Sequence, residues 1–175
     1  MPIAVTLRVD DPPLLALHDE AAIFGSVPSF RQRGYGLPIT LAVYEDLPTK
    51  VVRAPAARLF EGSIAIELLF EAVRWFEGPL LTLYAAPTPS PKLDAIFDRL
   101  HRLIAPERCR PHYRPGSFVP HCTLATGIKV KGREEALAFA LSLRADFARG
   151  DVVTFPPPRI EASWRLPSAA VRGHG

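Results

Sequence analysis

The sequence predicts an α+β fold in which mainly antiparallel sheets carry helices on their outer faces, and three observations support it. Strand and helix segments follow one another in the order β α β α β β α β α β β, so that single helices separate strands or pairs of strands. Apolar residues recur at every second position in the strand segments and at helical spacing in the helix segments. With 175 residues, 48% of them hydrophobic, the chain is long enough for one domain with a substantial core and too short for two. We therefore expect a single domain over residues 1–175.

The first half of the chain supplies four strands and two helices. The strands are expected at 3–9, 37–45, 64–70 and 80–86, and the helices at 11–24 and 49–59. Strict alternation of apolar side chains predicts that the first strand is half-buried. Pro12 in the first turn and Gly25 after the last one delimit the first helix. The fourth strand is a continuous apolar run after a Gly-Pro turn, which fits the central strand of a hairpin, and Trp75 and Phe76 are expected to pack over it.

The second half supplies two helices and three strands. The helices are expected at 90–105 and 133–149, and the strands at 120–127, 151–155 and 159–166, with a loop at 107–120. Pro106 stops the first of these helices. In the second helix, Leu137, Leu141 and Phe147 would face inward and Gly150 would lie at the C-terminal end. This order of elements also allows a ferredoxin-like sandwich with one sheet.

The strand that begins after Pro120 carries polar residues at an informative spacing. Alternate side chains of a strand share a face, so His121 and Thr123 project one way while Cys122 and Leu124 project the other. An imidazole and a hydroxyl therefore stand side by side on an otherwise apolar strand, where a phosphate could bind. A structural histidine with satisfied hydrogen bonds is the alternative interpretation.

A similar segment occurs about half the chain length earlier. Leu-Pro-Ile-Thr-Leu-Ala at 37–42 and Pro-His-Cys-Thr-Leu-Ala at 120–125 share their Thr-Leu-Ala ending. This echo suggests two related half-units that each offer one polar strand position to a shared site. When the segments are superposed, Pro38 stands opposite His121.

The two runs that contain these segments resemble the motifs of a known family. Gly-Tyr-Gly-Leu-Pro-Ile-Thr-Leu-Ala-Val-Tyr at 34–44 and His-Tyr-Arg-Pro-Gly-Ser-Phe-Val-Pro-His-Cys-Thr-Leu-Ala at 112–125 are similar to the His-x-Thr/Ser motifs of the two-histidine phosphoesterase superfamily. That superfamily includes the 2'-5' RNA ligases and the cyclic nucleotide phosphodiesterases. The resemblance covers most of the chain and implies two lobes, pseudo-symmetric halves around a central cleft lined by motif strands near 37–45 and 120–127. The second motif is intact, whereas the first has Pro38 where family members tend to have histidine.

The resemblance implies that one histidine acts as general base and the other as general acid on a phosphodiester, without a metal or other cofactor. Hydroxyl groups two residues further on would bind the nonbridging oxygens. The implied catalytic residues here are His121, Thr123 and Thr40, and catalysis is expected to be impaired because Pro38 cannot transfer a proton. Among the other histidines, His112 is nearest to the second motif and is the one to test as a replacement; a solvent-exposed loop histidine is the alternative.

The implied partner is RNA or a nucleotide 2',3'-phosphate. Arg114, Arg110, Arg33 and Tyr35 flank the two motifs and are the candidate substrate-binding residues, because arginine can bind phosphate bidentately. Solvated surface arginines are the alternative. Two function classes remain open: a phosphodiesterase with 2'-5' RNA ligase-like chemistry, and a non-catalytic member of the same fold that binds a phosphorylated ligand or a protein.

Composition narrows the remaining possibilities. The net charge of +3 is scattered, which argues against a protein that coats nucleic acid but allows a local anion pocket. No His or Cys cluster has the spacing of a metal site, so none is expected. Two cysteines without a secretory segment predict reduced thiols and a cytoplasmic location, and no apolar run is long enough for a membrane span. We expect a monomer.

Overall fold

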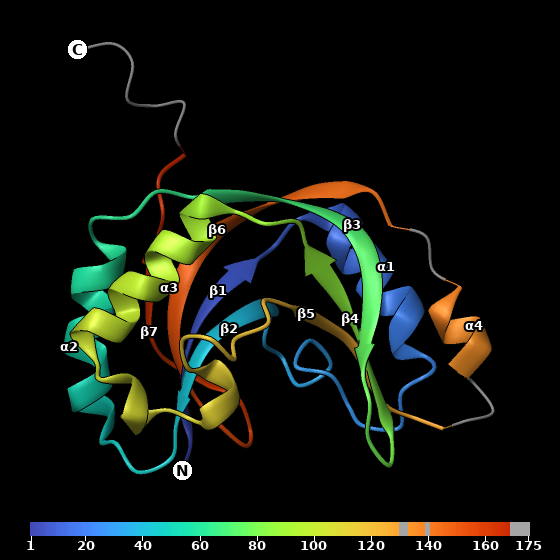
Figure 1. Cartoon of the computed structure of the whole chain (residues 1–175), viewed down its shortest axis with the longest axis horizontal. Coiled ribbons are helices and arrows are strands. Elements are labelled where there is room, and N and C mark those ends of the chain that lie inside the picture. The colour runs from blue at the N-terminus through green and yellow to red at the C-terminus, as the bar shows by residue number, and fades with distance from the viewer. Residues whose placement is uncertain (130–132, 139–140, 169–175) are drawn as a thin grey trace.

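The computed structural model describes residues 1–129, 133–138 and 141–168. In chain order the elements are β1 Ile3–Val9, α1 Pro12–Ala22, β2 Leu37–Tyr44, α2 Thr49–Phe60, β3 Ile66–Phe76, β4 Leu81–Pro87, α3 Pro91–Leu103, two 3₁₀ turns at Pro106–Arg108 and Pro111–Tyr113, β5 Cys122–Ile128, α4 Arg133–Leu137, β6 Leu143–Thr154 and β7 Arg159–Arg165. The predicted α+β class is confirmed. Helices α2 and α3 lie together on one side of the strands and α1 and α4 on the other (Figure 1).

In the described part of the chain, the strands form one antiparallel sheet of seven in the order β1-β2-β5-β4-β3-β6-β7, and β1 also pairs with β6. The first six strands therefore close into a circuit, and β7 extends it from β6. Neighbouring strands differ in the length over which they pair. β1 and β2 pair along their whole lengths, whereas β2 and β5 pair only where Ile39 meets Cys122. The two motif strands are neighbours in the sheet, and they are held together at one point.

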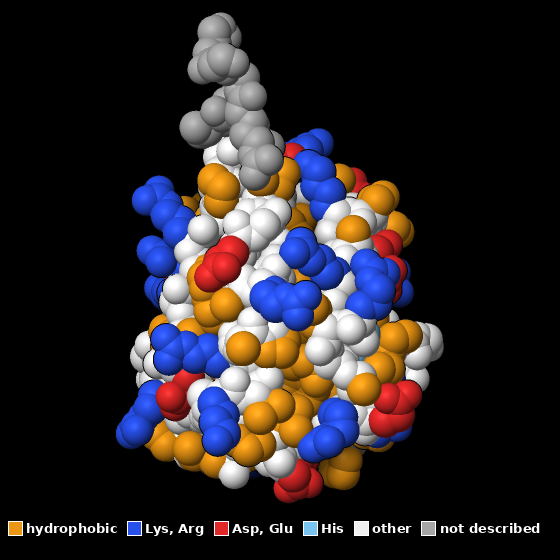
Figure 2. Space-filling model, turned by 90° about the vertical axis from the view of Figure 1, so that its left-hand side faces the viewer, with side chains coloured by type: hydrophobic (Ala, Val, Ile, Leu, Met, Phe, Trp, Pro, Cys, Tyr) orange, Lys and Arg blue, Asp and Glu red, His pale blue; other side chains and the backbone are white. Residues whose placement is uncertain are grey.

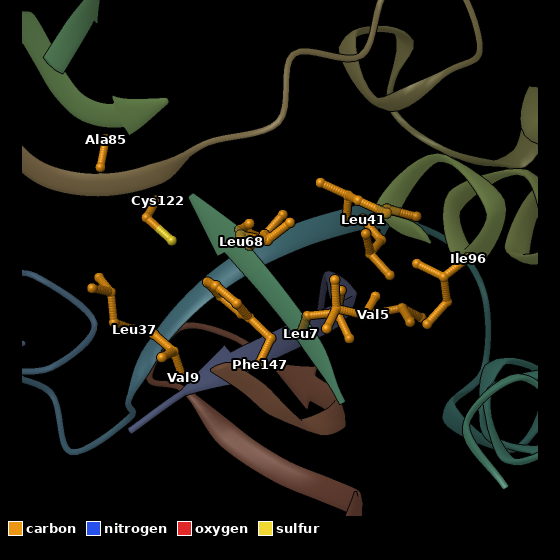
Figure 3. Packing of buried hydrophobic residues seen from close by; sticks show 14 of the residues in the cluster. Val5, Leu7, Val9, Leu37, Leu41, Leu68, Ala85, Ile96, Cys122 and Phe147 are labelled. Atoms are coloured by element: carbon orange, nitrogen blue, oxygen red, sulfur yellow. The ribbon is translucent and has the colours of Figure 1, made fainter. Parts of the chain in front are cut away.

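One buried cluster fills the space between the sheet and its helices. Leu7 of β1, Leu68 of β3, Phe147 of β6 and Cys122 of β5 meet in this cluster, as Figure 3 shows. Burial of such side chains is the main source of stability for a chain of this size. The cluster fixes the sheet face that points inward, and the opposite face is left for the polar motif residues.

Strand β1 is more buried than its alternation predicted. Thr6, which the half-buried pattern would expose, is only 2% exposed, and its Oγ1 lies 2.7 Å from the hydroxyl of Tyr35. The expectation of a half-buried strand was wrong because β1 pairs on both edges and the segment carrying Tyr35 covers its second face. A hydrogen-bonded hydroxyl can be buried there at little cost.

The predicted helix at 133–149 was wrong for most of its length. Only Arg133–Leu137 is helical; Leu143–Thr154 is strand β6, and residues 139–140 lie outside the described part of the chain. In β6, the buried Ala145 and Phe147 alternate with the exposed Arg144 and Asp146, which is the period of a strand. Pairing with β3 and β1 selects that conformation over the local helical pattern.

Other expectations need smaller corrections. Strand β3 continues to Phe76 instead of ending near residue 70, and the loop at 107–120 contains the 3₁₀ turn Pro111–Tyr113. Cys109 and Cys122 are both free thiols, as expected.

The surface agrees with the scattered charge of the sequence. On the face over α2 and α3 seen in Figure 2, Lys and Arg side chains are spread among hydrophobic and acidic ones. Within the described residues, no helix combines the length and apolar character needed to cross a bilayer.

Gly150 gives a test of this packing. It lies in β6 against the ring of Phe60, and a Cβ at this position would overlap that ring. We expect Gly150→Ala to lower the free energy of unfolding by about 1–3 kcal/mol, the usual cost of overpacking, measured by urea denaturation. Gly62→Ala is the control, because its Cβ would meet only the flexible guanidinium of Arg99 at 3.5 Å. Equal stability of the two variants would contradict the packing described here.

Candidate functional site

The pairing of Ile39 with Cys122 orients both motif strands. These two residues lie opposite each other in the antiparallel pair β2–β5, and both side chains are fully buried in the core cluster. Side chains that face each other across two strands point to the same side of the sheet, and the adjacent positions point to the other side. The residues next to Ile39 and Cys122 therefore project away from the core.

Those neighbouring residues are the predicted motif residues. The antiparallel direction sets Thr40 beside His121 and Pro38 beside Thr123. Thr40, His121 and Thr123 are half-buried, whereas Pro38 is buried. The structure thus brings together the three residues that the sequence nominated as catalytic, on one face and on two adjacent strands.

The imidazole of His121 is held in a defined orientation. Its Nδ1 lies 2.7 Å from the carbonyl oxygen of Val119. A carbonyl oxygen can only accept, so Nδ1 carries the proton and donates it, and in the neutral ring Nε2 keeps a free lone pair. Two aromatic rings meet His121 edge-on, with centroids 5.0 Å away for Phe76 and 5.5 Å for Tyr84, and these two rings stack on each other at 4.3 Å.

His121 opens onto a pocket of about 360 Å³, here called the His121 pocket. Its lining is Phe76, His112, Tyr113, Ser117, Val119 and His121. The ring of His112 lies against that of Tyr113, with centroids 4.3 Å apart. Thr40 hydrogen-bonds the side chain of Tyr113, which connects β2 to the pocket wall. Two histidines therefore share one pocket next to the motif strands.

The surroundings favour the neutral form of both histidines. Burial lowers the pKa of His121 below its usual value; the carbonyl of Val119 opposes this shift, and the nearby His112 adds to it. Partial desolvation by its neighbours also lowers the pKa of His112, and the charge of Arg110 adds to that shift. Each ring can therefore accept a proton at neutral pH.

A second, smaller pocket of about 180 Å³ has Thr123 in its lining and is called the Arg33 pocket. Its lining is His18, Val27, Pro28, Ser29, Phe30, Arg33, Leu37, Thr123, Ala125 and Thr126. Arg33 is exposed here, so this predicted ligand residue does reach a pocket that includes a motif hydroxyl.

The other two candidate arginines make contacts within the protein. Arg110 forms an ion pair with Glu45 and lies over the ring of Phe155. Arg114 donates from Nε to the carbonyl of Cys109 at 3.0 Å, and its second contact is the carbonyl of Glu107 at 3.1 Å, so it braces the loop that precedes the second motif.

The side chain of Tyr35, the fourth candidate ligand residue, also makes its contacts within the protein. Its hydroxyl donates to Asp151 at 2.9 Å and contacts Thr6, and the guanidinium of Arg8 lies over its ring at 5.5 Å. Burial, followed by the charge of Asp151, raises the pKa of Tyr35 above its usual range. Because the side chain is 5% exposed, its polar end faces the protein interior.

Several pocket residues were missed by sequence reasoning. Phe76 was expected to pack over the hairpin, and it does stack on Tyr84, but its contact with His121 was not foreseen. This contact follows from the pairing of Tyr84 in β4 with Thr123 in β5, which brings the stacked rings next to His121. The register of that pair depends on the tertiary fold and cannot be derived from local sequence. Trp75 is 40% exposed and donates its indole N–H to Glu77 at 2.7 Å.

Among the described residues, His, Cys, Asp and Glu form no group of three or more that could hold a metal ion.

Comparison with solved structures supports the same fold. TT0787 of Thermus thermophilus superposes with a TM-score of 0.69 at 17% identity, covering 97% of this chain and 100% of that one. E. coli LigT complexed with 3'-AMP gives 0.61 at 16% identity, covering 95% and 99%. Kluyveromyces marxianus Usb1 gives 0.53 at 10% identity, covering 95% and 97%.

The sequence comparison identifies the family. No curated protein sequence matches the chain. The family profile of the 2'-5' RNA ligase superfamily matches residues 37–153, a span that includes both motif strands and most of the sheet. The chain therefore belongs to the 2'-5' RNA ligase superfamily, within the two-histidine phosphoesterases.

Proposed function

We propose that this protein is a phosphodiesterase of the 2'-5' RNA ligase type that binds and slowly cleaves 2',3'-phosphates of nucleotides or RNA. The observation that carries the proposal is the imidazole of His121, which lines a pocket and whose Nδ1 is fixed by the carbonyl of Val119, so that the neutral ring has its lone pair on Nε2. E. coli LigT has been solved with 3'-AMP, ATP and NADP⁺, which supports a nucleotide as the ligand of this fold.

The proposed role of His121 is general base. In its neutral form Nε2 accepts a proton from the attacking water, and the Val119 carbonyl stabilises the imidazolium that forms. The hydroxyls of Thr123 and of the Thr40–Tyr113 pair donate to the nonbridging oxygens as negative charge develops. This proton transfer needs neither a metal nor another cofactor.

We propose that catalysis is slow because Pro38 stands where a second histidine is expected. It lies beside Thr123 in the sheet and has no titratable group. A positioned acid or base contributes about 10² to 10⁴ in rate, so the loss of one is expected to leave measurable but weak activity. Arg33, exposed in the pocket next to Thr123, is the arginine that we propose to attract the phosphate.

The protonation of His121 can be checked directly. Burial disfavours the charged ring, so we expect its pKa to fall below the usual value, with the neutral Nδ1–H tautomer present at pH 7. Nitrogen-15 chemical shifts of the histidine rings, recorded as a function of pH, measure both properties. A ring protonated at Nε2 when neutral would contradict the hydrogen bond to Val119 and the role of base.

The activity is tested with nucleoside 2',3'-cyclic monophosphates. We expect slow hydrolysis by the native protein, a loss of at least about 100-fold in His121→Ala, and a gain of up to about 100-fold in Pro38→His, since the first change removes a proton-transfer group and the second puts an imidazole back on the motif strand. Product formation by chromatography is the measurement. Arg102→Gln, on the exposed side of α3, is the control.

Two results would overturn the proposal. One is native hydrolysis that persists in His121→Ala. The other is tight nucleotide binding by calorimetry without turnover in either the native protein or Pro38→His, which would indicate a non-catalytic member that binds phosphorylated ligands.

A further inference from the structure

The motif strands offer no second histidine that could protonate the leaving oxygen. In phosphodiester cleavage without a metal, one group removes a proton from the nucleophile and another gives a proton to the departing oxygen. Pro38 cannot do so, and Thr123 beside it carries a hydroxyl that does not ionise near neutral pH. A second titratable side chain must come from elsewhere if the chain turns over substrate.

Two other described histidines are poorly placed for this task. His18 is 1% exposed, and its Nε2 is buried, although the residue contributes to the wall of the Arg33 pocket. His101 is 7% exposed, in α3, where its ring packs against Phe97 with centroids 4.5 Å apart. Neither imidazole is open to a ligand at His121.

We propose that His112 is the second proton-transfer group of this site, in place of the histidine absent at Pro38. The inference rests on the proposed function and adds a residue to it. His112 is exposed, and it lines the same 360 Å³ pocket as His121, together with Tyr113 and Ser117. It belongs to the 3₁₀ turn Pro111–Tyr113, outside the segments 37–42 and 120–125 that share the Thr-Leu-Ala ending.

The turn that carries His112 is fixed to strand β2 on both sides of the histidine. Before it, the backbone N–H of Arg110 donates to the carbonyl of Val43 at 2.9 Å. After it, the side chain of Tyr113 is hydrogen-bonded by Thr40. Because Thr40 stands beside His121 in the sheet, these ties hold His112 at a constant position relative to His121. Such positioning is what proton transfer to a bound phosphoester requires.

The proton movements balance in this arrangement. Nε2 of His121 takes a proton from water, and the water oxygen forms a bond to phosphorus. The bond from phosphorus to one ribose oxygen of the cyclic phosphate breaks, and that oxygen takes a proton from the imidazolium of His112. The product is a phosphomonoester. His121 then releases its proton to solvent and His112 takes one up, so no oxidant or co-reactant is needed.

The charges around His112 set the expected pH dependence. His121, Arg110 and Tyr113 face it, and Glu45 partly neutralises Arg110 by pairing with it. In the free protein the pKa of His112 is lowered by burial and by Arg110. A phosphate bound between the two rings favours the charged form of His112. The rate should fall at low pH as His121 is protonated, and at high pH as His112 loses its proton.

The experiment compares His112→Gln with His121→Gln on two substrates. With a nucleoside 2',3'-cyclic monophosphate we expect His112→Gln to lose about 10² to 10³ in kcat, and to lose the high-pH limb of the profile while the low-pH limb remains. With the 4-nitrophenyl ester of a nucleoside phosphate, whose leaving group needs no proton, His112→Gln should retain its rate within about threefold, whereas His121→Gln should lose activity on both substrates.

A rescue variant and a control complete the test. His112→Gln combined with Pro38→His should recover most of the lost rate, since the second imidazole returns on β2. Arg102→Gln should behave as the native protein, and thermal melting checks that each variant is folded.

Two outcomes would overturn the inference. If the native protein cleaves the cyclic phosphate, His121→Gln abolishes this and His112→Gln leaves it unchanged, His112 is not the donor and the proposed function stands. If neither substrate is cleaved by the native protein or by Pro38→His, the proposed function fails and the inference fails with it.

Discussion

The single pairing of Ile39 with Cys122 is the constraint on which the site depends. It is the position at which the two motif strands pair, and both side chains are buried in the core. Because side chains alternate along a strand, this one contact directs Thr40, His121 and Thr123 to the opposite face. A shift of one residue in β5 would turn the imidazole of His121 into the core and the thiol of Cys122 outward, and the same shift in β2 would turn Thr40 inward and Ile39 outward. The core thus determines the geometry of the polar site.

Next to this pair of residues, contacts within the protein orient the imidazole of His121 without a ligand. The Val119 carbonyl fixes the tautomer of His121, the stacked rings of Phe76 and Tyr84 limit its rotation, and burial lowers its pKa and so favours the neutral ring. Such preorganisation lowers the cost of reaching a reactive arrangement. A second imidazole, that of His112 in a loop, lines the same pocket as His121.

The sequence was sufficient for the motif face and for most elements, because period-two alternation determines which residues share a face. It predicted His121, Thr123 and Thr40 on one surface, but it missed the strand at Leu143–Thr154, where local helical spacing competed with pairing to β1 and β3. It also could not separate Arg33, which lines a pocket, from Arg110, which pairs with Glu45. Those contacts join residues far apart in the chain, so composition and local spacing do not encode them.

The central claim is that a phosphoryl group binds over the junction of the two motif strands. A crystal structure of the protein with a nucleoside 2'-phosphate tests it most directly. We predict a phosphate oxygen within about 2.7–3.2 Å of Nε2 of His121, the range of a hydrogen bond, with the ligand in the pocket shared with His112. A phosphate held only in the Arg33 pocket, or on the outer surface of α2 and α3, would contradict it.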